Sequence, residues 1–174
     1  MAAAKTQEES MKISILKKYL APVALLAWIG VAGPAYAEPT CTPSRAIGRW
    51  AFTETGTIRL PTGSIAFGAV GVVTVDADGN VAGTSVSSTG VASSGTLSGV
   101  LTVNPEDCSF TVTTAVYDAA GTLQRYLDFA GVFTSNFDGL HAIVTSLRLP
   151  NGTPLPSVIT LNAERQVPGV GSER

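Results

Sequence analysis

From residue 47 onward, apolar and polar residues alternate in short runs that are separated by clusters of Gly, Pro, Asn and Asp. A period of two is that of a β-strand with one buried face, and no stretch shows the period of an amphipathic helix. The longest connection is expected at Thr57–Ser64, between the first two strands. The pattern predicts eight strands, over residues 47–56, 65–76, 80–89, 95–104, 109–118, 122–134, 140–149 and 157–165.

The turns between these strands predict how they are connected. Asp76–Asn80, Asp118–Gly121 and Asn136–Gly139 combine Asx side chains with glycine, which is the chemistry of tight hairpins. Eight consecutive hairpin-linked strands favour an all-β fold, an eight-stranded antiparallel up-and-down barrel whose closure removes both edges. An immunoglobulin-like sandwich is the second interpretation, although the expected Trp in a central strand is missing. An outer-membrane barrel is the third, although its aromatic girdles are missing.

One face of the predicted sheet is rich in aromatic residues. Three glycines, Gly71, Gly99 and Gly131, lie on the same face, so the interior is either a packed core or a cavity. If it is a cavity, we expect it to open away from Trp50 and to be lined by Phe67, Leu127 and Phe129. The predicted inward residues that would contact a ligand are Trp50, Phe52, Phe67, Leu127, Phe129 and Phe133.

Glu54 shares its face with Trp50 and Phe52, and two environments are open to it. Burial of this carboxyl without a partner would be costly, and Arg125 and Arg148 are the cations able to pair with it across the barrel. Alternatively, Glu54 lies at the rim in contact with water. We expect Glu54, Arg125 or Arg148 to be the polar group that orients a ligand.

The first 37 residues have the organisation of a secretory signal peptide. Lys12, Lys17 and Lys18 precede the apolar stretch 21–33, and Ala35 and Ala37 supply small residues before a cleavage site at Glu38. Translation starts at Met1 or Met11. An uncleaved anchor is the alternative, but we expect no membrane insertion after cleavage. The predicted organisation is therefore a signal peptide (1–37), a barrel domain (38–166) and a polar tail (167–174), with a secreted or periplasmic location.

Charge and cysteine content bear on the partners of the protein and on its covalent structure. All four lysines lie in the leader, and the remainder carries seven arginines against eleven acidic residues, which argues against a nucleic-acid partner. Its Thr- and Val-rich outer faces make a homo-oligomer plausible. Cys41 and Cys108 are the only cysteines, and export to an oxidising compartment predicts a disulfide between them.

Recognisable catalytic and metal-binding motifs are absent from the sequence. The single histidine, His141, has no nucleophile motif to accompany it, and a lone strand histidine is usually structural. Two cysteines and one histidine supply too few ligands for a zinc site, and no dinucleotide- or phosphate-binding glycine motif occurs. We therefore expect no metal and no cofactor, and whether the protein is an enzyme stays open.

The opening Gly48-Arg49-Trp50 resembles the G-x-W motif of the calycin barrels, which include the lipocalins. In that family a late Arg, here Arg165, packs on the Trp to close one barrel end, so the resemblance implies a Trp50–Arg165 contact. The T-D-x-x-Y motif of the lipocalins is absent. The G-x-W-x-F opening and the Asn104–Cys108 turn (NPEDC) look more like exported bacterial proteins with an allene-oxide-cyclase-type barrel.

Three functions follow from these observations. The favoured hypothesis is a secreted barrel that binds an apolar small molecule in its interior. The second is a cyclase or isomerase of the allene-oxide-cyclase type, and here the resemblance gives Glu54 the catalytic role. The third is a structural or interaction protein with a filled barrel.

Overall fold

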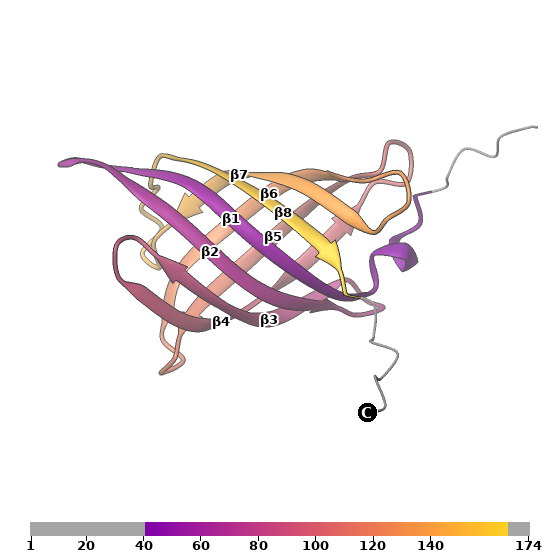
Figure 1. Ribbon diagram of the computed structural model, residues 1–174, viewed down its shortest axis with the longest axis horizontal. Helices are drawn as coiled ribbons and strands as arrows, with labels where there is room; N and C mark the ends of the chain where they lie inside the picture. Colours follow the sequence, from indigo (N-terminus) through magenta and orange to yellow (C-terminus); the bar gives the residue numbers. More distant parts are fainter. Residues whose placement is uncertain (1–40, 167–174) are drawn as a thin grey trace, which may run out of the picture. The chain divides into compact units, whose positions relative to one another are not determined.

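The protein is a closed barrel of eight antiparallel strands, each paired with its neighbours in chain order (Figure 1). The computed structural model describes residues 41–166, so the predicted signal peptide (1–37) and tail (167–174) lie outside the described residues. One turn of 3-10 helix, η1 (Pro43–Ala46), precedes the barrel. The strands are β1 (Gly48–Leu60), β2 (Gly63–Val75), β3 (Asn80–Ser88), β4 (Ala92–Val103), β5 (Ser109–Asp118), β6 (Leu123–Phe133), β7 (Gly139–Arg148) and β8 (Ser157–Arg165).

The pairing of β1 with β8 closes the sheet. Residues 50–58 of β1 pair with residues 157–165 of β8, and Trp50 lies directly opposite Arg165. No strand edge is therefore left along this seam, where an open sheet would expose unpaired backbone groups. The predicted up-and-down barrel is confirmed, and the sandwich interpretation is wrong.

The predicted long connection between the first two strands is wrong. β1 continues to Leu60 and β2 begins at Gly63, so only two residues turn the chain. Ile58 is buried, which extends the period of two beyond the predicted end of the strand. The positive φ of Gly63, 134°, lies outside the range that other residues readily adopt and fits the start of β2 directly after the turn.

The strands show the predicted alternation between an inner and an outer face. In β1, Trp50, Phe52 and Glu54 are buried, whereas Arg49, before Trp50, and Thr53, between Phe52 and Glu54, are exposed. The predicted homo-oligomer stays a prediction. The exposed apolar residues on the outer faces, which an oligomer would cover, are Val70, Val86, Val100, Val132, Ile143 and Val158. In residues 41–166, no helix is long and apolar enough to cross a membrane.

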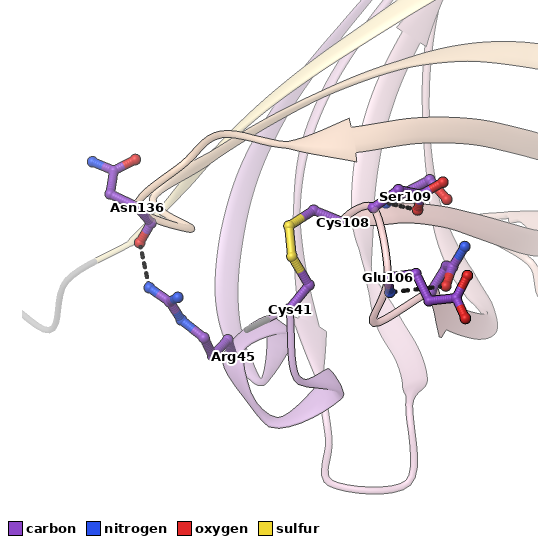
Figure 2. The surroundings of a disulfide bond; sticks show 8 residues. Cys41, Arg45, Glu106, Cys108, Ser109 and Asn136 are labelled. Carbon is purple, nitrogen blue, oxygen red and sulfur yellow. Dashed lines mark hydrogen bonds between the residues drawn. A yellow bond between two sulfur atoms is a disulfide. The ribbon is translucent and has the colours of Figure 1, made fainter. Parts of the chain in front are cut away.

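The two cysteines form the predicted disulfide, shown in Figure 2. Their Cα atoms are 5.1 Å apart, and the bond joins the segment before η1 to the turn between β4 and β5. Arg45 of η1 also donates a hydrogen bond to the backbone oxygen of Asn136, in the turn between β6 and β7. These two contacts hold η1 against the end of the barrel at which β8 finishes.

Candidate functional site

The barrel contains a partly open cavity of about 90 Å³ that is lined by inward side chains of all eight strands. A single water needs only about 10–15 Å³, whereas an engineered cavity of about 150 Å³ binds benzene. The interior is therefore not completely filled, and its free volume lies between these two values. Several inward apolar side chains stay half-buried because they face this space: Val73, Leu97, Leu101, Val112, Leu140 and Leu161.

The end of the cavity at Trp50 is covered by η1 and the turn between β6 and β7. Trp50 is 2% exposed, and its indole Nε1 donates a 2.9 Å hydrogen bond to the backbone oxygen of Ala46. The Phe137 ring, from the turn, is buried and stacks on Phe133 with ring centroids 4.6 Å apart. Phe137 was missed because it lies in a turn sequence, where an aromatic residue flanked by Asn and Asp was the only signal.

Arg165 joins the parts of this cover, as the resemblance implied. Its guanidinium carbon lies 4.8 Å from the centroid of the Trp50 ring. The same group donates hydrogen bonds to three backbone oxygens, those of Arg45, Ile47 and Phe137. Because the guanidinium has several donors in one plane, one side chain satisfies carbonyls from both η1 and the β6–β7 turn.

At the other end, on the side of β1, β2, β7 and β8, apolar side chains fill the barrel. The cavity therefore lies nearer to Trp50 than we expected from the sequence. Phe67, predicted to line it, does not: its ring is buried, and the Arg125 guanidinium lies over it at 5.4 Å from the centroid. The buried residues that occupy this part of the barrel are Ile58, Phe67, Val144, Leu147 and Ile159.

Glu54 lines the cavity and is 6% exposed, so the rim position left open by the sequence is wrong. Its neighbours across the sheet are Ala69 on β2 and Leu161 on β8, neither of which offers a hydrogen bond from its side chain. Burial removes the carboxylate from water and raises the pKa of Glu54 from 4.5 to about 7, against the opposing attraction of Arg125. The carboxyl therefore changes its charge near neutral pH.

Arg125 is the cation that faces Glu54, from β6 on another part of the barrel wall. Burial lowers the pKa of Arg125, while the charge of Glu54 raises it. Among the described residues, no hydrogen bond or salt bridge joins these two side chains, and Nε of Arg125 is buried without a hydrogen-bond partner. The two groups interact through the field across the cavity, and each keeps hydrogen-bonding capacity for a molecule between them.

Arg148, the other predicted partner of Glu54, lies outside the barrel. Its side chain is 40% exposed and makes a 2.7 Å salt bridge with Asp128. The reason is a β-bulge: Asp128 pairs with Ser146 and Phe129 with Val144, so Thr145 is an extra residue on β7. Beyond it the inner and outer faces exchange, Leu147 is buried, and Arg148 points out.

The other predicted ligand-contacting residues line the cavity. They are Trp50, Phe52, Leu127, Phe129 and Phe133, which come from β1 and β6. Two further polar residues line the cavity, Ser85 and Thr114, and neither was predicted from the sequence to contact a ligand. The Thr114 hydroxyl donates to the backbone oxygen of Leu127 at 3.2 Å.

Two of the inward glycines do not create the free volume that we expected from them. A Cβ atom at Gly71 would lie 2.6 Å from the Phe52 ring, and one at Gly131 would lie 2.6 Å from the Phe110 ring. The aromatic rings thus occupy the space that these glycines leave open. The cavity exists because the remaining inward side chains do not reach one another.

Comparison with known proteins identifies the fold. No protein-family profile and no curated protein sequence matches this chain. Among solved structures, one described as EF1p2_mFAP2b bound to DFHBI matches with a TM-score of 0.50 and 10% identity, over 71% of this chain and 95% of that one. The fold is lipocalin-like.

Two further solved structures match at lower TM-scores. The S-type phycobiliprotein lyase CPES from Guillardia theta has a TM-score of 0.41 and 8% identity, over 72% of this chain and 91% of that one. Rv2717c from M. tuberculosis has a TM-score of 0.38 and 15% identity, over 71% and 94%. At these identities the likeness concerns the barrel fold and not its activity.

Proposed function

We propose that this lipocalin-like barrel binds an apolar small molecule in the cavity between Trp50 and the Glu54–Arg125 pair. The observation that carries the proposal is the cavity itself: an unfilled volume with a mostly apolar lining and a few polar groups is typical of ligand sites. The neighbour with a TM-score of 0.50 was solved bound to DFHBI, which supports the use of this architecture for a ligand.

Binding is tested with small apolar probes. Hexanol and benzene should raise the melting temperature of the protein in a saturable manner, because they bind only the folded state. Native mass spectrometry of the protein recovered from its source should detect a bound molecule as a mass adduct. If no probe binds and no adduct is found, the filled-barrel alternative replaces this proposal.

A pair of variants locates the binding site. Leu97 lines the cavity, and Ser98, the next residue of β4, is exposed on the outer face. Leu97→Phe should occupy part of the cavity and reduce hexanol affinity, whereas Ser98→Phe should leave it unchanged. Equal affinities in the two variants would place the bound probe elsewhere on the protein.

A second candidate function is a cyclase or isomerase of the allene-oxide-cyclase type. The specific support is Glu54, since a carboxyl with a pKa of about 7 inside an apolar cavity can give or take a proton near neutral pH. In this case Glu54→Gln would abolish turnover of an apolar substrate while its binding remained. Retained turnover in Glu54→Gln would exclude this mechanism.

We propose that the protein acts in the periplasm or outside the cell. The disulfide between Cys41 and Cys108 supports this location, because such bonds persist in oxidising compartments. The exported protein should begin at Glu38, which N-terminal sequencing measures. An intact leader on the exported protein would contradict cleavage.

A further inference from the structure

The polar end of the cavity has an unusual composition. Among its described lining residues only Glu54 and Arg125 are titratable, and the other polar lining residues are Ser85 and Thr114. The walls next to Glu54 on β2 and β8 present Ala69 and Leu161. Among these lining residues, no third charged side chain is therefore present to pair with Glu54 or Arg125.

Both members of the pair lack the hydrogen bonds that buried polar groups normally have. Glu54 is more than nine-tenths buried and has no side-chain hydrogen bond within residues 41–166. Nε of Arg125 is buried and unpartnered in the same part of the molecule. A molecule that supplied acceptors between them would satisfy a donor on Arg125, and a protonated Glu54 would supply a second donor.

We propose that the ligand is a small apolar monocarboxylic acid, whose carboxylate binds between the guanidinium of Arg125 and the protonated carboxyl of Glu54. This inference rests on the proposed binding function and adds the chemical class of the ligand. An anion suits the site because the cation then has a partner at hydrogen-bond distance, and charge-assisted hydrogen bonds are the strong ones. The apolar part of the acid would lie toward Trp50 and Phe129, which line the rest of the cavity.

The arrangement couples ligand binding to a proton. Two carboxylates cannot share this site while both are charged, so Glu54 must be protonated when the ligand carboxylate enters. The pKa of Glu54 is about 7 without ligand, so the required proton is already bound below that pH and has to be taken up above it. Affinity for the acid should therefore be highest below about pH 7 and fall as the pH rises.

The test compares butanoate and hexanoate with butanol and hexanol on the full chain by calorimetric titration. At pH 6 the acids should bind at least about tenfold more tightly than the alcohols, as expected for added charge-assisted hydrogen bonds. At pH 8, titration in two buffers of different ionisation enthalpy should reveal net proton uptake with the acids and none with the alcohols. This readout needs no variant.

Three variants assign the effect to residues. Arg125→Met should abolish the preference for acid while alcohol binding remains. Glu54→Gln, which stays neutral, should keep the preference at pH 6 and extend it unchanged to pH 8. Arg148→Met is the matched control, because Arg148 pairs with Asp128 on the outer face, and it should behave as the wild type.

The outcomes distinguish a failure of the carboxylate inference from a failure of the proposed small-molecule binding. If alcohols bind as tightly as acids, or acids bind without proton uptake at pH 8, the carboxylate inference is wrong and the binding function stands. If neither class binds, the proposed function fails as well. If Arg125→Met does not fold, the acid preference and the proton uptake of the wild type still decide the question.

Discussion

The carboxyl of Glu54 lies among apolar side chains. Its charged form there loses hydration and gains only the attraction of Arg125 across the cavity. In the unfolded chain the same carboxyl is in water and has its ordinary pKa of 4.5. The folded state therefore binds a proton more tightly than the unfolded state, and folding stability must depend on pH through this one residue.

The sign of that dependence is opposite to that of a salt-bridged carboxylate. Below pH 4.5 the carboxyl is protonated in both states, and Glu54 imposes no penalty. Between pH 4.5 and about 7 only the unfolded state loses its proton, so stability falls as the pH rises. Above about pH 7 the full penalty is present, of the order of 3 kcal/mol for this difference in pKa.

We predict that Glu54→Gln removes most of the loss of stability between pH 5 and pH 8. Urea unfolding at both pH values measures the free energy of unfolding, and subtracting the variant from the wild type cancels the contributions of all other titrating groups. Glu164→Gln, at an exposed position of β8, is the control and should keep the wild-type dependence. If Glu54→Gln and the wild type lose the same free energy, Glu54 is solvated and not buried.

At the scale of the strands, aromatic rings and glycines are matched across neighbouring β-strands. Gly71 of β2 lies opposite Phe52 of β1, and Gly131 of β6 lies opposite Phe110 of β5. Each ring occupies the space above its glycine, which lets bulky side chains point into a narrow barrel without clashing.

We predict that Gly71→Ala destabilises the protein by about 1–3 kcal/mol, because the new methyl group would lie 2.3 Å from the backbone oxygen of Thr84 and 2.6 Å from the Phe52 ring. Gly68→Ala is the control on the same strand, since the nearest atom to its Cβ would be 3.8 Å away. Urea unfolding of both variants gives the comparison. Equal stabilities would mean that the backbone of β3 at Thr84 and the Phe52 ring both move aside at little cost.

The strands also show what the sequence could and could not predict. Strict alternation correctly placed Trp50 and Phe52 inside, because β1 pairs with both of its neighbours without a register shift. Arg148 follows the bulge at Thr145, where one extra residue exchanges the two faces, and the only sign of it in the sequence is that the apolar spacing widens from two residues to three between Val144 and Leu147. The burial of Glu54 was equally hidden, because it depends on which distant side chains fill the barrel ends.

For the molecule as a whole, the disulfide is the one covalent link between distant parts of the described chain. It joins residues separated by 67 positions. In the chain-entropy model such a loop stabilises the folded state by roughly 4 kcal/mol, because it restricts the unfolded chain. Here it also fixes η1, whose Ala46 accepts the hydrogen bond from Trp50.

We predict that reduction lowers the free energy of unfolding by roughly this 4 kcal/mol. Urea unfolding with and without a thiol reductant measures the difference. The double variant Cys41→Ser, Cys108→Ser should match the reduced wild type and should not respond to the reductant. An unchanged unfolding midpoint on reduction would show that non-covalent contacts alone hold η1.

Because β1 pairs with β8, every strand of the barrel has two neighbours and none is an edge strand. The barrel therefore depends on which strands pair and not on where the polypeptide chain begins. The start of β1 and the end of β8 are neighbours, since the amide of Gln166 donates to the backbone oxygen of Arg49 at 2.8 Å. A circular permutant that links these points through a flexible peptide, and starts instead between Pro61 and Thr62, should close into the same barrel.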